Sequence, residues 1–355
     1  MCVATELCAG VPVRARGLTL VELMVALVIG LLISLAAALN AQQFLASQRQ
    51  SVGVGGASMN AISALAAIKN DIANGGLGFM GDSTVLCTTL NFSQGAAVVS
   101  DGANFAPVQA ARVGDNDVLD IVYGNQVAAG AAVNLALSSD GTAANLRTLL
   151  PVAIDQIVLL SPPTSATPCL LRSVTASVAP TADARQVVTF GAAGNLNQVA
   201  FTTSSVLPAD SRATLFGTLQ WNRYSVVGGN LVVTRVLTGE SAILVRNVIG
   251  FRVEYGISAA AANSSTLEDW QAPGTFGSVT SANIRRVRAL RVGIVVRSPQ
   301  REKVNTNGDC EASAEKPSLF GVAKVIQPDV ADWPCYRYRS TIIVAPMRNI
   351  IYGTM

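Results

Sequence analysis

Four neighbouring residues with side-chain oxygens are the first candidates for binding chemistry in this sequence. Asn116 stands among three carboxylates, Asp115, Asp117 and Asp120. Ca²⁺ favours six to eight hard oxygen ligands, so such a group could hold this ion, but the spacing does not match an EF-hand loop. A turn that leads into a strand accounts for the same residues, and we favour that interpretation.

A second oxygen-rich stretch lies further along the chain. Its members are Asn305, Asn307, Asp309, Glu311 and Glu315. Calcium is again the ion that such ligands would select, but a polar loop tethered by a disulfide explains the stretch as well. We therefore expect no resident metal and no cofactor.

Seven basic residues gather around one predicted strand, and a row of this kind could contact the phosphates of DNA. They are Arg285, Arg286, Arg288, Arg291, Arg297, Arg301 and Lys303. The run lacks aromatic residues for base stacking, and the net charge of the whole chain is only +3. We interpret the row as a solvated strand face paired with acids elsewhere or with a neighbouring subunit, and we expect no nucleic acid partner.

Histidine is absent from the 355 residues. This absence excludes Ser-His-Asp and Cys-His activation of a nucleophile and every imidazole metal site. The sequence also contains no Walker-type loop, nucleophile elbow or metal-ligand spacing. We therefore expect that the protein is not an enzyme.

An apolar block near the N-terminus has the length of a membrane span. Residues 18–39 contain one charged residue, Glu22, and as a helix they would extend about 33 Å, against a hydrocarbon core of about 30 Å. Arg14 and Arg16 precede the block, so the positive-inside rule puts the N-terminus in the cytoplasm and exports the residues beyond the block. A carboxylate inside an apolar helix costs about 2.5–3.5 kcal/mol, so Glu22 is expected to have a specific partner.

An ordinary secretory signal is the competing interpretation of this block. The alanines at 36–38 offer a small-residue cleavage site, and a soluble product would then start near Asn40. The block is longer than the usual apolar region of about 7–15 residues, and a carboxylate near its start weakens insertion. We therefore favour a chain that stays anchored.

The residues around this block resemble the processing site of type IV prepilins. The matching run is RGLTLVELM, at residues 16–24. The resemblance implies that residues 1–17 are a leader peptide, that a prepilin peptidase cuts between Gly17 and Leu18, and that the new Leu18 amine is methylated. It also implies an assembly role for Glu22, because a positive amine on one subunit can neutralise this carboxylate of a neighbour in the low dielectric of a filament core.

Beyond the block, the pattern predicts a helix that continues through residues 40–75. Its apolar residues recur at three- and four-residue intervals, which predicts one stripe that packs on a sheet. The stripe consists of Met59, Ile62, Leu65, Ile68 and Ile72. Glycines at 53–56 are expected to mark a bend or a local melt, and Gly75-Gly76 is expected to end the helix.

The pattern of residues 76–355 predicts a β-rich domain. Predicted strands cover residues 118–123, 154–160, 187–190, 199–207, 248–255, 287–297 and 338–345, and a hairpin covers 219–236. Prolines suggest an irregular surface insertion around 161–183. The expected fold class is α+β and pilin-like: a long N-terminal helix, transmembrane in residues 18–39, whose periplasmic half packs on an antiparallel, β-rich globular domain.

Several of these segments, in order along the chain, resemble the PilW family of minor pilins. They are residues 70–72 with 76–79, 117–121, 248–256, 295–298, and 338–344 with Arg348 and Asn349. The resemblance implies a minor pilin of a type IV pilus that primes assembly with other minor pilins, near the tip. It implies an inner-membrane protein with a periplasmic domain that later joins the extracellular pilus. The implied partners are a prepilin peptidase, other minor pilins, the major pilin, a tip adhesin and, before assembly, inner-membrane lipid.

Other functions stay open on the sequence alone. A large minor pseudopilin of a type II secretion system would share the precursor site and the β-rich domain. A secreted enzyme or binding protein would result from a conventional signal peptide, and a DNA-capturing surface protein would be consistent with the basic row.

Six cysteines are present, and two of them, Cys2 and Cys8, precede the apolar block. The other four are Cys87, Cys169, Cys310 and Cys335. An even number in an exported chain suggests two disulfides, and four cysteines allow three pairings. We favour Cys310 with Cys335, because they bracket a loop rich in Asn, Gly and Pro whose closure contributes about 2–4 kcal/mol. Cys87 with Cys169 is then the remaining pair, by elimination.

Overall fold

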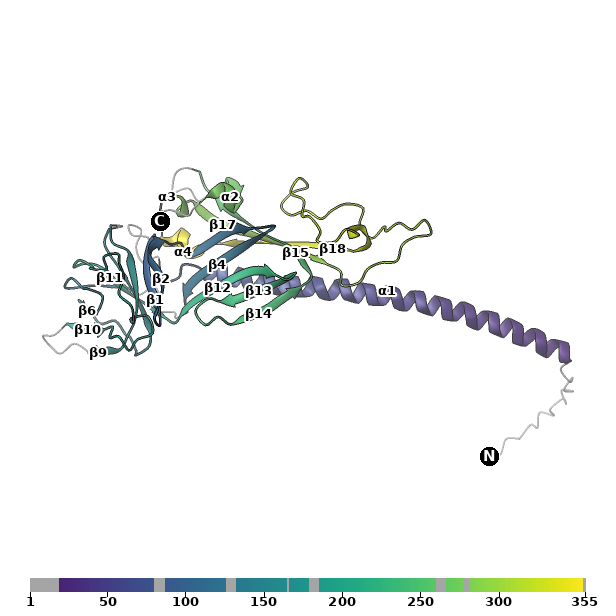
Figure 1. Ribbon diagram of the computed structural model, residues 1–355, viewed down its shortest axis with the longest axis horizontal. Helices are drawn as coiled ribbons and strands as arrows, with labels where there is room; N and C mark the ends of the chain where they lie inside the picture. The colour runs from purple at the N-terminus through teal and green to yellow at the C-terminus, as the bar shows by residue number, and fades with distance from the viewer. Residues whose placement is uncertain are drawn as a thin grey trace, which may run out of the picture. The chain divides into compact units, whose positions relative to one another are not determined.

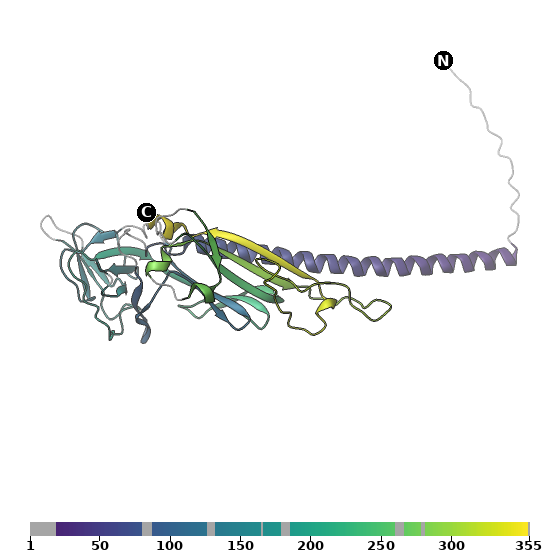
Figure 2. The same ribbon diagram turned by 90° about the horizontal axis from the view of Figure 1, so that it is seen from above.

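The computed structural model describes residues 19–79, 87–125, 132–164, 166–178, 185–259, 266–277 and 281–353. The chain divides into two units, residues 1–52 and residues 53–355, which are drawn in Figures 1 and 2. The expected cleavage point between Gly17 and Leu18 lies outside the described residues.

One long helix, α1 (Leu20–Asn74), begins in the first unit and ends in the second. Its backbone stays helical through Gly53, Gly55 and Gly56, where the sequence predicted a bend or a local melt. The boundary between the two units falls beside the same glycines. The helix ends where the sequence predicted, because Gly76 adopts a φ of +81°, which interrupts the right-handed helix.

Two antiparallel sheets lie beside the C-terminal part of α1 in the second unit (Figure 1). The five-stranded sheet has the order β14 (Ser241–Arg246), β13 (Asn230–Arg235), β12 (Leu219–Val227), β4 (Asn116–Gly124) and β3 (Val108–Val113). The four-stranded sheet has the order β16 (Asp269–Gln271), β15 (Val248–Ile257), β17 (Val287–Arg297) and β18 (Tyr338–Pro346). The predicted hairpin is β12 with β13: Gly228 and Gly229 have φ values of +56° and +72°, as a type I′ turn requires.

Two further sheets occupy the part of the second unit where Figure 1 labels β1, β2, β6 and β9–β11. The six-stranded sheet has the order β2 (Ala97–Asn104), β1 (Thr89–Gln94), β8 (Cys169–Ser173), β7 (Ile157–Ser161), β11 (Arg212–Gly217) and β5 (Ala132–Asn134). The three-stranded sheet has the order β6 (Ala143–Leu146), β10 (Gln186–Thr189) and β9 (Ala176–Val178). Strand β1 runs parallel to β8, and the other strand pairs among the described residues are antiparallel.

Short helical segments also lie among the described residues of the second unit. They are α2 (Pro273–Phe276), α3 (Ser281–Ile284), the 3₁₀ turn η2 (Trp333–Cys335) and α4 (Arg348–Gly353). Turn η2 belongs to a long excursion, residues 298–337, that separates the paired strands β17 and β18. The expected fold class, α+β with a long N-terminal helix and a β-rich domain, is confirmed.

The largest hydrophobic core is formed by α1 with the five- and four-stranded sheets. Helix α1 contributes Ala61, Ala64, Leu65, Ile68 and Ile72 to it. The predicted stripe is therefore wrong at its start, because Met59 is 72% exposed and Ile62 is 56% exposed. At about 100° per residue these two side chains lie outside the buried arc. The small side chains of Ala61 and Ala64 let the helix backbone approach the sheets instead.

Two predictions for the middle of the chain are also wrong. Residues 199–207 form no strand, and Leu207 makes only an isolated bridge to Ser139. The neighbouring strand β11, which the sequence analysis missed, lies inside the six-stranded sheet. The expected irregular insertion at 161–183 contains β9 and the fully buried strand β8. Its prolines up to residue 168 precede β8 and do not interrupt it.

Candidate functional site

The start of α1 is an exposed apolar helix. The segment Leu20–Ala41 is long and apolar enough to cross a membrane, and large side chains such as Leu20 and Leu31 are 75% and 69% exposed. Continuous apolar surface of this size marks a region that contacts lipid or other protein. The hydroxyl of Ser34 donates to the carbonyl of Gly30 at 2.7 Å, so this polar group is satisfied within the helix.

Thr19 and Glu22 bind each other at the first turn of α1. The Glu22 carboxylate accepts hydrogen bonds of 3.0 Å from the Thr19 backbone N–H and from its hydroxyl, and Thr19 Oγ1 accepts one of 3.3 Å from the Glu22 N–H. This reciprocal arrangement is a capping box, which satisfies N–H groups that no helical carbonyl can reach. The sequence analysis missed it, although the T-x-x-E spacing of residues 19–22 is its signature.

The capping box leaves part of the Glu22 carboxylate available. Both bonds from Thr19 end on Oε2, and within the described residues Oε1 has no hydrogen-bond donor. A carboxylate oxygen with open acceptor sites can bind a further cationic donor without breaking the cap. The predicted site residues Gly17 and Leu18, which would border this turn, lie outside the described residues.

Asp71 ties the last turns of α1 to strands β4 and β12. Its carboxylate accepts hydrogen bonds from the hydroxyls of Tyr123 (2.9 Å) and Tyr224 (2.6 Å) and from the side-chain amide of Asn222 (2.7 Å). The pKa of both tyrosines is raised above the ordinary value, mainly by burial and secondly by the negative charge of Asp71. Both hydroxyls therefore remain protonated donors, and hydrogen bonds to a charged acceptor contribute about 1.5–3 kcal/mol each.

Asn349 of α4 caps the other end of α1. Its side-chain amide lies 3.1–3.2 Å from the carbonyl oxygens of Ala73, Asn74 and Gly75 and donates to them. The last carbonyls of a helix have no partner inside the helix, so a side-chain donor at this place stabilises its end. A residue near the C-terminus of the chain therefore completes the helix that begins near the N-terminus.

Two family models match this chain. The model described as type IV pilus-assembly protein W, PilW, matches residues 222–349, and the model of the prokaryotic N-terminal methylation motif matches residues 13–38. Together, the two matches are those of a type IV pilus PilW-like pilin. The methylation motif contains the capping box and most of the membrane-length segment, and the PilW match extends from β12 into α4. A search of curated proteins found no match.

Among solved structures, the PilW-like pilin is similar to a type IV-like pilin, TTHA1219 from Thermus thermophilus. The sequence identity is 9% and the TM-score is 0.34, over 82% of this chain and 96% of the other. The pilin-type motif implies processing by a prepilin peptidase and interaction with other pilins, and with the apolar helix it fits an inner-membrane anchor.

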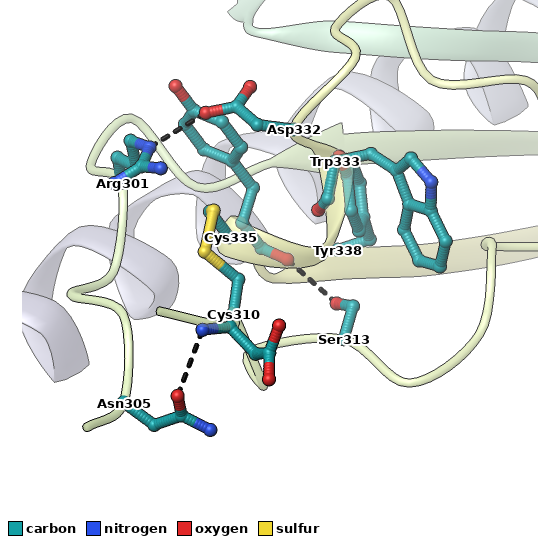
Figure 3. The surroundings of a disulfide bond; sticks show 10 residues. Arg301, Asn305, Cys310, Ser313, Asp332, Trp333, Cys335 and Tyr338 are labelled. Atoms are coloured by element: carbon teal, nitrogen blue, oxygen red, sulfur yellow. Dashed lines mark hydrogen bonds and ion pairs between the residues drawn. A yellow bond between two sulfur atoms is a disulfide. The ribbon is translucent and has the colours of Figure 1, made fainter. Parts of the chain in front are cut away.

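In the part of the PilW-like pilin that the structure describes, two disulfides are present, Cys87–Cys169 and Cys310–Cys335, with Cα atoms 5.7 and 4.8 Å apart. These are the pairs favoured from the sequence. Cys169 is the first residue of β8, so one bridge joins two segments of the six-stranded sheet region. The other closes the excursion between β17 and β18 (Figure 3). Beside it, Arg301 Nε forms an ion pair with Asp332 Oδ2 at 2.7 Å.

The oxygen-rich stretch of this excursion is used for local folding. Asn305 Oδ1 accepts hydrogen bonds of 2.9 Å from the backbone N–H groups of Asn307 and Asp309, and its amide donates to Glu311 at 2.7 Å. These bonds form a polar loop beside the disulfide. In the part of the chain that the structure describes, no group of three or more acidic or cysteine side chains is placed to hold a metal ion.

The aspartates of β4 also have protein partners. Asp117 is fully buried, forms an ion pair with Arg112 and accepts a hydrogen bond of 2.7 Å from the N–H of Val253. Asp120 binds Arg223 through two hydrogen bonds of 2.8 and 3.0 Å. Residues three positions apart on a strand point to opposite faces, so the structure does not bring Asp117 and Asp120 together.

The basic row is divided among separate partners. Arg286 donates to the carbonyls of Ser258 and Ala259. Arg297 pairs with Asp329 at 2.6 Å, Arg301 pairs with Asp332, and Arg291 pairs with the buried Glu254. Pairing with acids elsewhere in the chain was the favoured interpretation of this row. A phosphate would have to compete with these partners.

Proposed function

We propose that this PilW-like pilin is a minor pilin of a type IV pilus, and that it primes pilus assembly together with other minor pilins and lies near the tip. The match of residues 222–349 to the PilW model, behind a pilin methylation motif, carries the proposal. The large β-rich unit, whose described strands form four sheets, also supports it, because a subunit of this size and irregularity fits a terminal position better than a repeating one. The role is structural and not enzymatic.

The proposal includes the maturation of the N-terminus. A prepilin peptidase removes residues 1–17 by cutting between Gly17 and Leu18, and the Leu18 amine is methylated. The membrane segment then holds the protein in the inner membrane with a cytoplasmic N-terminus and a periplasmic β-rich domain. In the filament, Glu22 accepts the positive N-terminal amine of a neighbouring pilin through the oxygen that the capping box leaves open.

The first test is mass analysis of the N-terminus of protein recovered from membranes of the native host. We expect a chain that starts with methylated Leu18. A chain that starts near Asn40 would contradict the proposal, because it would have lost the membrane segment to a signal peptidase.

The second test is deletion of the gene followed by complementation. The deletion strain should have far fewer surface pili and normal type II secretion, and wild-type protein should restore the pili. Glu22→Ala should be processed normally but fail to restore them, while the surface variant Glu240→Gln should restore them fully. Loss of type II secretion with normal pili would instead identify a pseudopilin.

A further inference from the structure

A hollow of about 410 Å³ lies on the outer face of the four-stranded sheet. Its floor is formed by residues 252–254 of β15 and one wall by residues 269–272 with Thr275. The other wall is formed by residues of the excursion between Leu319 and Ile326. Arg112 of β3 completes the lining. The volume falls in the range of about 300–1,000 Å³ that is typical of small-molecule sites.

Three glycines of β15 and β17 allow the two walls to pack closely against the sheet. A Cβ atom on Gly256 would come within 2.5 Å of Leu267 and 2.9 Å of Trp270, and one on Gly293 within 2.8 Å of Leu319. The third, Gly250, lies in the same way beneath Ile326. Both walls therefore rest directly on the sheet backbone, and the hollow is a preformed feature of the second unit.

Glu254, a carboxylate paired with two cations, is the acidic residue of the floor of the hollow. Glu254 has a side chain only 4% exposed, and its two oxygens pair with Arg291 and Lys324. The guanidinium of Arg291 lies between the rings of Trp270 and Phe320, 4.8 and 4.5 Å from their centroids. Because both of its oxygens have cationic partners, Glu254 offers little attraction to a cationic ligand.

Two arginines of the lining keep unused donors. Arg252 donates only through Nη1, to the carbonyls of Asp115 and Phe251, and Arg112 donates only through Nε, to Asp117. Within the described residues the other N–H groups of both guanidiniums have no acceptor, and Arg252 has no carboxylate partner. The pKa of Arg252 is lowered, mainly by burial and secondly by the positive charge of Arg112. An anion between the two guanidiniums would offset the repulsion between their charges.

We propose that this hollow binds a sugar acid, whose carboxylate is held by Arg112 and Arg252. A guanidinium presents parallel N–H donors that match the two oxygens of a carboxylate. Gln271, Thr275 and the exposed carboxylate of Asp269 provide hydrogen-bonding groups for sugar hydroxyls, and the apolar side chains of the walls cover the ring. This binding activity goes beyond the proposed role in pilus assembly and does not depend on it.

Calorimetric titration of the full-length protein in detergent micelles tests the site, at constant ionic strength, with sodium glucuronate as the probe. Glucuronate should bind saturably with one site per chain. Glucose, which lacks the carboxylate, and acetate, which lacks the sugar ring, should each bind at least about tenfold more weakly, in line with the loss of one good interaction of about 1.4 kcal/mol.

Arg252→Gln should weaken glucuronate binding at least about tenfold, and Arg252→Lys should retain part of it. Arg235→Gln is the matched control, because it removes the same charge from an exposed ion pair, between Arg235 of β13 and Glu240 of the loop that follows. This variant should bind glucuronate like the wild type. Arg112 is left unchanged, since its loss would leave the buried Asp117 without its ion pair. Absence of saturable glucuronate binding, equal binding of glucose or acetate, or equal losses in R252Q and R235Q would overturn the proposal.

Discussion

The hydroxyl of Tyr224 on β12 lies 2.6 Å from the carboxylate of Asp71 near the end of α1, and the two residues are 153 positions apart in the chain. With Tyr123 and Asn222, Tyr224 surrounds this carboxylate with donors. The group fixes the helix on the five-stranded sheet by directional bonds, in addition to the apolar contacts of Leu65, Ile68 and Ile72.

Tyr224→Phe should lower the free energy of unfolding by about 1.5–3 kcal/mol, because it removes a hydrogen bond to a charged acceptor. Urea denaturation of the full-length protein in detergent measures this loss. Tyr338→Phe is the control, since its hydroxyl donates to the neutral carbonyl of Trp333 at 3.2 Å, and it should cost about 1 kcal/mol or less. Equal losses would show that the charge of Asp71 contributes nothing.

The same tyrosine predicts a loss of stability at alkaline pH. Burial and Asp71 raise the pKa of Tyr224 in the folded protein, whereas an unfolded tyrosine titrates at about 10. Above that pH the unfolded chain releases the proton and the folded chain keeps it, so the stabilisation is complete below about pH 10 and declines above it. The stability difference between wild type and Tyr224→Phe should therefore shrink above about pH 10. A constant difference across this range would contradict the assignment.

The two disulfides should differ in their contribution to stability. Cys87–Cys169 links residues 82 positions apart and Cys310–Cys335 links residues 25 positions apart, so the chain-entropy relation gives about 4.5 and about 3.5 kcal/mol. We expect the Cys87→Ser/Cys169→Ser variant to unfold at a lower urea concentration than the Cys310→Ser/Cys335→Ser variant. The reverse order would contradict this prediction. It would mean that Cys310–Cys335 stabilises the folded excursion by more than the loop-length relation gives.

Glu254→Gln should destabilise the protein by about 3–5 kcal/mol, because it leaves Arg291 without the carboxylate of a largely buried pair. Lys324 loses its partner at the same time, so trypsin should cut the excursion faster. Denaturation and limited proteolysis measure the two effects. The matched control is Glu240→Gln, whose exposed pair with Arg235 should contribute less than about 1 kcal/mol. Similar effects of both variants would contradict this prediction.

Thr19→Ala should reduce the amount of protein that enters filaments, because it removes the cap that holds the first turn of α1 and positions Glu22. Loss of such a cap costs about 0.5–2 kcal/mol. Immunoblots of sheared pili, normalised to membrane-bound protein, measure the effect. Thr19→Ser keeps the hydroxyl and should behave like the wild type. Equal incorporation of the alanine and serine variants would show that the cap has no part in assembly.

The sequence alone was sufficient for features that depend on neighbouring residues. The length and apolar character of residues 18–39 predict the membrane-length helix, and the sequence Gly228-Gly229-Asn230 predicts the turn between β12 and β13. The end of α1 at Asn74 is explained by Gly75 and Gly76. These features are local, because helix length, turn geometry and capping are decided within a few residues.

The same local reasoning failed in the middle of the chain. Strand β8 is buried at all five positions and lies inside a sheet, so it lacks the alternation that marks a half-buried strand. Prolines close to it suggested an irregular insertion. Similarly, Met59 and Ile62 fit the spacing of an apolar stripe, but only contact with the sheets decides which arc of the helix is buried.

Residue types and their spacing were enough to predict a prepilin-type N-terminus, a membrane-length helix and a β-rich domain. The particular partners of the charged residues could be identified only from the fold. Glu254 meets Lys324 across 70 positions, and Asp71 meets Tyr224 across 153. Such pairs, and the hollow beside Arg252, arise when distant strands are placed side by side. No local pattern specifies them, because the free energy of a long-range pair depends on the fold that brings its partners together and removes water from them.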